Sequence, residues 1–265
     1  MKLISSTRRF GTPAGRMRAI LMRPERQSGP VPGLLWLHGG GYVSGMASMA
    51  YFTAGRKLAK HYGAVLLAPN YRLAVRSPYP AALDDCYAAL RYLWERAEEL
   101  GVDRKRIIVG GESAGGGLAA AVCIRARDEG EIPVSFQIPL YPMLDCRDTD
   151  SSRRSHSHGW GTRRNHWGWH LYLREKYGTD DVPPYASPSR ETNYAGLPPC
   201  YTYVEDREPF YDETLAYVRN LREAGVEARA DVFPGNIHGF DTMVWTKNSK
   251  EAIRKLIAAA EKYMG

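Results

Sequence analysis

The stretch Gly110-Gly111-Glu112-Ser113-Ala114-Gly115-Gly116-Gly117 decides how this chain of 265 residues presents a reactive group. It follows the apolar run 106–109, which has the length of a strand, and precedes the apolar, helix-length segment 118–126. Its centre, Gly111-x-Ser113-x-Gly115, is the nucleophile-elbow pattern, in which a sharp strand-to-helix turn holds a serine in a strained conformation. Glycines stand two residues to either side because larger side chains would collide with that turn. The pattern predicts a Ser113 hydroxyl at the start of a helix, where backbone N–H groups favour a developing anion.

Apolar runs of strand length alternate with helix-length segments along the rest of the chain. Several runs are apolar without alternation, which is typical of parallel strands that are covered on both faces. We therefore expect an α/β fold whose mostly parallel sheet of eight strands carries helices on both faces. The expected strands are 33–37, 64–68, 106–109, 134–138, 201–204 and 228–233, with two antiparallel strands at 3–10 and 16–23. The expected helices are 81–100, 118–126, 214–224 and 249–264.

Composition excludes several classes of protein. Hydrophobic residues make up 44% of the chain and charged residues 25%, which is ordinary for a globular domain. No apolar run approaches the length of a membrane span, and the opening apolar stretch 1–4 is too short for a signal peptide, so a cytoplasmic protein is expected. The formal net charge is +7, but the basic residues are scattered and no nucleic-acid-binding motif is present, so no nucleic-acid partner is expected. Four cysteines without a CxxC spacing argue against a thiolate metal site.

A second glycine-rich loop, His38-Gly39-Gly40-Gly41, directly follows the expected strand 33–37. Successive glycines leave backbone N–H groups uncovered, which suits a hole that binds an oxyanion. We expect the donors to be the N–H groups of Gly40, Gly41 and Ala114. His38 itself is expected to brace the turn rather than to take part in chemistry.

A histidine follows the last expected strand, within Gly235-Asn236-Ile237-His238-Gly239-Phe240. A loop in this place reaches the carboxyl edge of the sheet, so His238 is expected to act as general base for Ser113. Such a base needs a carboxylate that fixes its tautomer. Sequence spacing alone does not choose among the acidic residues that follow two of the strands, which are Glu205, Asp206, Glu208, Asp212, Glu213 and Asp145.

Residues 146–187 break the strand–helix rhythm and contain four of the seven histidines and three of the six tryptophans. We expect an insertion that covers one end of the sheet as a cap within a single domain, 1–265. Trp160 and Trp167, together with Tyr42, are the expected substrate-binding residues. His166 and His170 are four residues apart, but no HExxH pattern accompanies them, so an apolar lid is favoured over a metal site and no metal or other cofactor is expected. The arginines of the insertion are expected to form a solvated face, with a preference for anionic or sugar-bearing substrates as the alternative.

The motifs together resemble the hormone-sensitive-lipase-like branch of the α/β-hydrolase esterases. The resemblance runs from about residue 30 to the end and includes the HGGG and GESAGG segments, Asn70-Tyr71-Arg72-Leu73-Ala74, Leu140-Tyr141-Pro142-Met143-Leu144-Asp145 and His238-Gly239-Phe240. That family usually carries its acid as the first Asp of Asp-Pro-Phe/Leu-x-Asp-Glu, and here the segment reads Glu208-Pro209-Phe210-Tyr211-Asp212-Glu213. The resemblance therefore implies an α/β-hydrolase fold and places Glu208 at the acid position, with Asp206, Asp212 and Asp145 as alternatives.

The resemblance implies a carboxylesterase that acts on small-molecule esters, and a homodimer as a possible assembly. A short chain without a large cap favours short acyl groups, from acetyl to about hexanoyl. Two other functions fit the same residues. One is an amidase or peptidase with the same Ser-His-Glu triad, and the other is a non-catalytic binding protein on the same fold.

Overall fold

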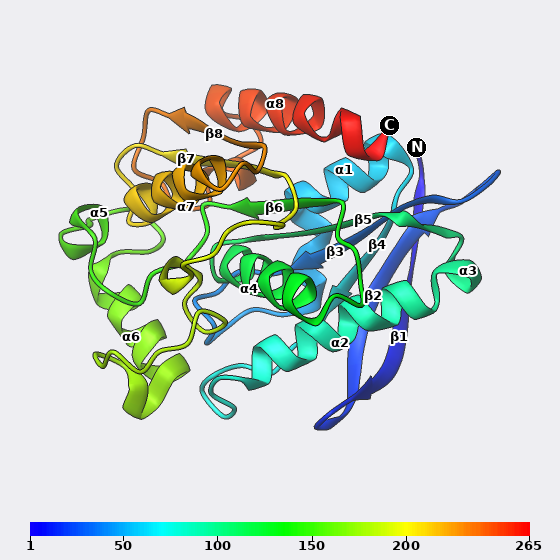
Figure 1. Cartoon of the computed structure of the whole chain (residues 1–265). Helices are drawn as coiled ribbons and strands as arrows, with labels where there is room; N and C mark the ends of the chain where they lie inside the picture. The colour runs from blue at the N-terminus through cyan, green and yellow to red at the C-terminus, as the bar shows by residue number, and fades with distance from the viewer.

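One twisted eight-stranded sheet organises the molecule, and the computed structural model describes all residues from 1 to 265 (Figure 1). The strand order is β1-β2-β4-β3-β5-β6-β7-β8. Strand β2 pairs antiparallel with both β1 and β4, and the pairs from β4 through β8 are all parallel. The expected α/β fold with a mostly parallel sheet of eight strands is therefore confirmed. The strands are β1 Leu3–Thr12, β2 Gly15–Pro24, β3 Val31–Leu37, β4 Val65–Pro69, β5 Val102–Glu112, β6 Phe136–Leu140, β7 Cys200–Glu205 and β8 Ala228–Phe233.

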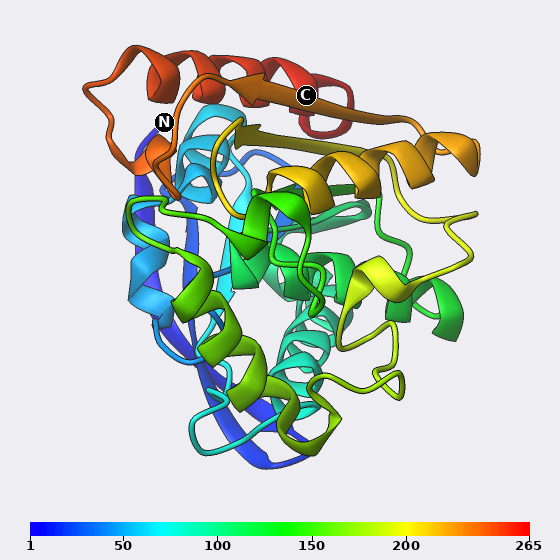
Figure 2. The same cartoon turned by 90° about the vertical axis from the view of Figure 1, so that its left-hand side faces the viewer.

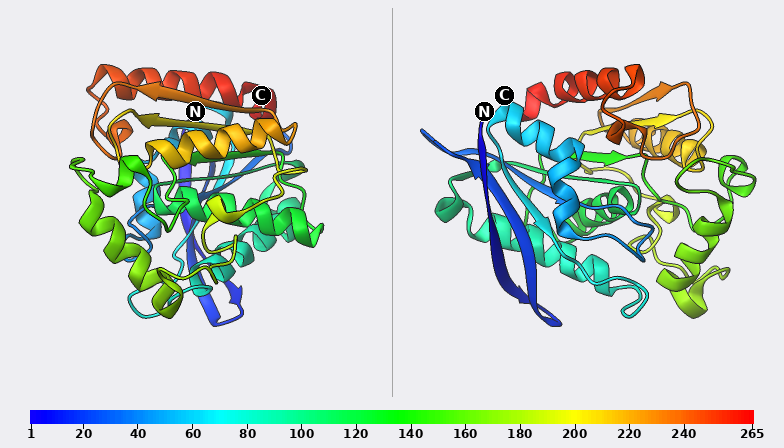
Figure 3. Two further views of the ribbon diagram at one scale, coloured as in Figure 1. Left: turned by 60° about the vertical axis from the view of Figure 1, so that its left-hand side comes forward. Right: turned by 180° about the vertical axis from the view of Figure 1, so that it is seen from behind.

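Helices cover both faces of the sheet, with α2, α4 and α7 on one face and α1 and α8 on the other (Figures 1 and 3). The helices are α1 Ala54–Tyr62, α2 Ala81–Glu95, α3 Ala97–Leu100, α4 Ala114–Glu129, α5 Asp150–Arg153, α6 Thr162–Leu173, α7 Tyr211–Glu223 and α8 Lys247–Met264. Short 3₁₀ helices lie at η1 Ala47–Phe52, η2 Arg174–Lys176, η3 Pro188–Arg190 and η4 Phe240–Thr242. The expected single helix over 81–100 is two helices that meet at Arg96, and the second ends at Gly101, whose φ of 67° is left-handed. Helix α1 was not expected from the sequence.

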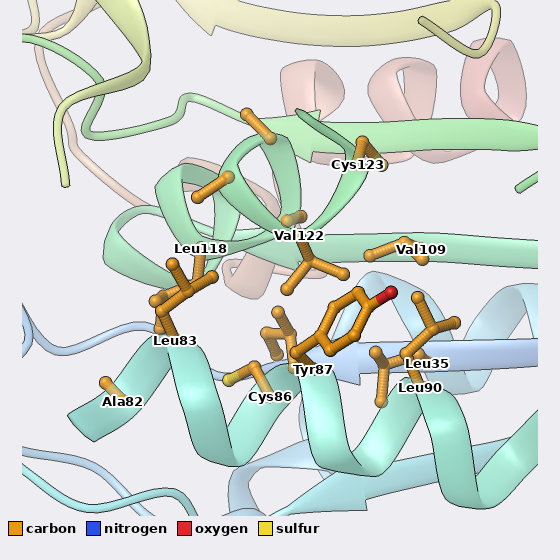
Figure 4. Close-up of a cluster of buried hydrophobic side chains, with 14 of the residues drawn as sticks. Leu35, Ala82, Leu83, Cys86, Tyr87, Leu90, Val109, Leu118, Val122 and Cys123 are labelled. Carbon is orange, nitrogen blue, oxygen red and sulfur yellow. The ribbon is translucent and has the colours of Figure 1, made fainter. Parts of the chain in front are cut away.

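The core follows from the apolar runs in the central strands. Every residue of β4 and of β6 is buried, because helices pack on both faces of these strands. Figure 4 shows part of one face, where Leu83 and Tyr87 of α2 meet Leu118 and Val122 of α4 above the sheet. The outermost strand β1 is instead mostly exposed and polar. An exposed, charged edge strand of this kind does not readily pair with another chain.

The carboxyl ends of the parallel strands all lie at one side of the sheet, and residues 146–187 lie over that side (Figure 2). Helix α6 is anchored there by buried aromatic side chains. Tyr172 stacks on Tyr42 with ring centroids 4.0 Å apart, and Trp169 is 1% exposed beside both rings. The Tyr172 carbonyl also accepts a hydrogen bond from the Tyr79 N–H. The loops that follow β3, β5, β7 and β8 therefore meet beneath this segment.

No helix in the structure combines the length and the apolar character that crossing a bilayer requires.

Candidate active site

The turn between β5 and α4 gives Ser113 a backbone conformation that side chains rarely adopt, with φ 59° and ψ −122°. Ser113 is the N-terminal cap of α4, so its hydroxyl lies beside backbone N–H groups that have no partner within the helix. The flanking glycines allow close backbone approach. A Cβ on Gly111 would lie 2.4 Å from the Gly115 carbonyl oxygen, and one on Gly115 would lie 2.1 Å from that of Leu37. The geometry is that of the elbow expected from the sequence.

Ser113, His238 and Glu208 form one hydrogen-bonded chain. The Ser113 Oγ lies 2.8 Å from Nε2 of His238, and Nδ1 of His238 lies 3.1 Å from Oε2 of Glu208. The three residues come from the ends of β5, β8 and β7 respectively, and are separated by up to 125 positions in the chain. The structure thus brings together the serine, the histidine and the acid that the sequence singled out.

The Glu208 carboxylate is fully buried and His238 is its only hydrogen-bond donor. Burial, together with the nearby Glu205 and Asp241 carboxylates, raises the pKa of Glu208. Burial lowers the pKa of His238 to about 4, so the imidazole is neutral at pH 7. The edge-to-face rings of Tyr141 and Phe210, with centroids 5.1 and 5.0 Å from that of His238, form its apolar surroundings.

Three other acidic residues considered for the acid position have partners other than His238. Asp206 is exposed and accepts a hydrogen bond from the Gly235 N–H at 2.9 Å. Asp212 accepts from the Ser151 N–H at 2.7 Å, and Asp145 pairs with Arg147 through two hydrogen bonds of 2.9 Å. None of the three carboxylates hydrogen-bonds His238. Contacts in the folded chain, which sequence spacing could not supply, single out Glu208.

The glycine-rich loop after β3 lies beside the Ser113 hydroxyl. Gly40 and Gly41 have φ values of 120° and 60°, in the region that side chains avoid, and neither N–H donates to another group of the protein. Ala114 is the first residue of α4, so its N–H lies next to Ser113. His38 is buried, stacks on Tyr71 at 4.1 Å and hydrogen-bonds the Gly39 carbonyl through Nδ1, at 2.8 Å. These contacts fit its expected role in bracing the turn.

A cavity of about 890 Å³ opens at Ser113. Trp160 and Trp167 line it, as the sequence predicts, and the Trp160 ring packs against Gly41. Arg163 and Arg164, whose charge suggested anionic or sugar-bearing substrates, also line the cavity. For several other lining residues the sequence suggested no contact with substrate, namely Val43, Ser44, Met49, Tyr141, Gly159 and Thr242.

Tyr42 lies outside the cavity lining, in contrast to the expectation for it. Its ring is 1% exposed and its hydroxyl donates to the Met143 carbonyl at 2.8 Å, beneath helix α6. Its position next to the glycine loop suggested substrate contact, but the side chain packs inward and anchors the cap. Trp169 is buried in the same place, whereas Trp167 is 52% exposed at the cavity.

The paired histidines of the insertion have separate partners. Nε2 of His166 lies 2.7 Å from Asp148, and His170 lies against the Tyr177 ring. No group of three or more potential metal ligands occurs in the structure. The four cysteines are buried free thiols.

The cap insertion holds the loop that carries His238. The His238 N–H donates to the His158 carbonyl at 3.0 Å and lies 3.2 Å from the Ser157 Oγ, and the Ser157 hydroxyl donates to the Asn236 carbonyl at 2.7 Å. The His158 N–H also donates to the Asn236 carbonyl, so the two loops pair as a short parallel bridge. Residues 146–187 therefore contact the loop that carries His238 and also contribute to the cavity lining.

Replacing Ser157 with Ala should lower kcat by about three- to thirtyfold with little change in KM, because small displacements of a reacting group are costly. Steady-state kinetics on one ester measure both parameters. Thr179→Ala is the matched control, since the Thr179 hydroxyl donates only to the Lys176 carbonyl, away from the His238 loop. An equal loss in the two variants, or a change confined to KM, would argue against a positioning role for Ser157.

Fold and site together define a serine hydrolase of the α/β type. Comparisons with known proteins agree: a family model for the alpha/beta hydrolase fold matches residues 34–242. The chain belongs to that family, in its hormone-sensitive-lipase-like branch, and is a carboxylic ester hydrolase.

Named relatives show the degree of similarity. Ethyl acetate hydrolase of Pseudomonas putida is 32% identical over 226 residues, which is 84% of this chain and 71% of that protein. Esterase LipI of Mycobacterium tuberculosis is 33% identical over 82% of this chain and 67% of its own length. Among solved structures, a bacterial heroin esterase matches with a TM-score of 0.93 and 37% identity, over 98% of this chain and 85% of the other. A hyperthermophilic esterase from Pyrobaculum calidifontis matches with a TM-score of 0.89 and 31% identity, over the same shares of the two chains.

Proposed function

We propose that this protein hydrolyses carboxylic esters of short acyl groups through a Ser113–His238–Glu208 triad and an acyl-enzyme. The observation that carries the proposal is the unbroken chain of hydrogen bonds from Glu208 through His238 to Ser113, which ends in an open cavity. Such a chain lets one residue take a proton from the serine while another stabilises the cation that forms.

Each group has one part in the reaction. His238 accepts the Ser113 proton at Nε2 as Oγ attacks the ester carbonyl, and the N–H groups of Gly40, Gly41 and Ala114 stabilise the resulting oxyanion. Glu208 accepts a hydrogen bond from Nδ1–H of His238. Nε2 therefore carries no proton and can accept the one from Ser113. His238 then protonates the departing alkoxide. In the second half of the reaction, His238 takes a proton from water as the water attacks the acyl-enzyme carbonyl, and the carboxylic acid and free Ser113 are released.

The preference for short acyl chains, acetyl to about hexanoyl, is supported by two observations. Trp160 packs against Gly41 and narrows the space beside the oxyanion loop. A relative that is 32% identical carries the name ethyl acetate hydrolase. The cavity of about 890 Å³ is larger than a short acyl group, and so leaves room for a sizeable alcohol part.

A series of p-nitrophenyl esters tests this proposal. We expect kcat/KM to be highest between two and six acyl carbons and to fall at least about tenfold by twelve, because a longer chain must displace the Trp160 wall. A maximum at twelve carbons would contradict the short-chain assignment. Matched p-nitroanilides should react far more slowly. Faster turnover of the anilides would favour the amidase or peptidase alternative, and no turnover of any ester would favour a non-catalytic binding protein.

The dependence of kcat/KM on pH should reflect the lowered pKa of the general base His238. Because burial lowers the pKa of His238 to about 4, the imidazole stays neutral, and therefore active, below its ordinary pKa of 6.5. Activity is lost as the pH falls and the His238–Glu208 pair takes up a proton. We expect kcat/KM on a neutral ester to be level from pH 8 to about 6.5 and to reach half its maximum below that. A midpoint at or above pH 7 would contradict the buried, neutral imidazole.

We further propose that the chain forms a single domain in which residues 146–187 are the cap. Contacts of Ser157 and His158 with the His238 loop support this assignment. Cytoplasmic location and a homodimer stay predictions.

A further inference from the structure

One wall of the cavity carries two arginines from the first turn of α6. Arg163 and Arg164 both line the cavity, and so does Trp167, one turn further along the same helix. Residues three and four apart share a helix face, so these three side chains form one continuous wall. The first turn of α6 contains no acidic residue. Two guanidinium groups therefore lie at the positive end of the helix dipole, where cations are unfavourable unless an anion accompanies them.

Arg163 and Arg164 lack the ion pairs that two other arginines of the insertion form; Arg154 lacks one as well, but it lies outside the cavity lining. Arg147 pairs with Asp145, and Arg153 with Asp150. Arg164 donates from Nη1 to the Gly159 carbonyl at 2.6 Å and forms no ion pair. Arg163 has neither an ion pair nor a hydrogen bond to another group of the protein. The positive charge on the cavity wall is thus not neutralised by a neighbouring carboxylate.

Acidic groups on the rest of the lining do not offset that charge. Glu112 is the one acidic residue among those that line the cavity. Its carboxyl is buried and accepts a hydrogen bond from the Ala54 N–H at 3.1 Å. Burial and the Asp241 carboxylate raise the pKa of Glu112 to about 8, which leaves it mostly protonated at neutral pH.

We infer that Arg163 and Arg164 select esters that carry a carboxylate in addition to the ester bond. A carboxylate matches the planar, forked donors of a guanidinium group, and the apolar Trp160 and Trp167 rings beside the arginines would hold its hydrocarbon part. The inference rests on the proposed function, because the same molecule must place its ester carbonyl at Ser113. It deepens that function by naming a class of substrate.

Two matched pairs of esters test the inference by placing the carboxylate on either side of the scissile bond. The first pair, 4-acetoxybenzoate and 4-acetoxybenzamide, differs in the charge of the alcohol part. The second pair, the p-nitrophenyl monoester of glutaric acid and p-nitrophenyl pentanoate, differs in the charge of the acyl part. For each ester, kcat/KM is measured at low ionic strength, after subtraction of the uncatalysed rate.

The charged ester of at least one pair should be preferred, and the arginines should carry that preference. We expect Arg163→Gln and Arg164→Gln each to reduce the charged-to-neutral ratio by about three- to tenfold, and added salt to reduce it in the wild type, because partly exposed charges are screened. Arg154→Gln is the matched control: Arg154 is an exposed cap arginine outside the cavity lining, and its substitution should leave the ratio unchanged. The thermal unfolding midpoints of all three variants should match that of the wild type.

The outcomes separate the inference from the function on which it rests. Turnover of the neutral esters without preference for the charged ester in either pair would overturn the inference and leave the esterase intact. A preference that survives in both the Arg163→Gln and Arg164→Gln variants would also overturn it. Failure of the wild type to hydrolyse any of the four esters would instead refute the proposed function, and the inference with it.

Discussion

Replacing Ser113 with Ala should lower kcat for p-nitrophenyl acetate by about four to six orders of magnitude, because Ser113 carries the only hydroxyl that hydrogen-bonds Nε2 of His238. The Ser113 Oγ is the atom that Nε2 of His238 contacts, at 2.8 Å. Alanine keeps the Cβ, so the strained turn stays in place and only the reacting oxygen is removed. Steady-state kinetics on freshly purified variant protein measure the loss.

Folding of the Ser113→Ala variant serves as its control. The midpoint of thermal unfolding should be equal to or slightly above that of the wild type, because a strained catalytic position often costs stability. A variant that unfolds normally and retains more than about a hundredth of the activity would show that another residue is the nucleophile.

Replacing Glu208 with Gln should lower kcat by about three orders of magnitude, because a neutral amide does not stabilise the imidazolium and no longer enforces its tautomer. Glu208→Asp keeps the charge on a side chain one methylene shorter, and should recover part of the lost rate. The kinetics of the three proteins on one ester distinguish a requirement for charge from a requirement for shape.

Asp206→Asn is the matched control for Glu208. The Asp206 side chain is exposed and contacts the Gly235 N–H, so its neutralisation should change kcat by less than about threefold. A large loss in Asp206→Asn together with a small loss in Glu208→Gln would move the acid to the other position.

The sequence was sufficient to predict the sheet because the central strands are buried on both faces and are therefore apolar throughout. The runs 64–68 and 228–233 lie within one residue of β4 and β8 as the structure has them. The elbow and the glycine loop were also predictable, since close backbone approach at Gly111 and Gly115 requires glycine. Patterns of this kind are local, and so can be recognised in a single sequence.

Features that depend on contacts between distant segments were not predictable in this way. Several carboxylates follow the strand that ends at Glu205, and their spacing does not choose among them. The family resemblance placed Glu208 at the acid position, and the fold shows its carboxylate within hydrogen-bond distance of His238. Tyr42 was expected to bind substrate, yet its ring packs under α6 against Tyr172. Helix α1 was missed because its apolar positions are few and several of its residues are charged or glycine.

The hydrogen bonds between residues 157–158 and the His238 loop were likewise not predictable from the sequence. Ser157 and His158 belong to a polar segment without regular structure, and nothing in their order indicates that they meet residues 236–238. Their contacts connect residues 146–187 to the loop that carries His238.

Reaction with diethyl p-nitrophenyl phosphate tests most directly whether Ser113, His238 and Glu208, which follow three different strands, form one reactive centre. This reagent transfers its phosphoryl group to a serine that a neighbouring base has activated. We expect one equivalent to bind per chain, at Ser113 by peptide mapping, with ester hydrolysis abolished and with His238→Ala protein left unlabelled. Labelling at another residue, or full ester hydrolysis by protein that is labelled at Ser113, would contradict the account.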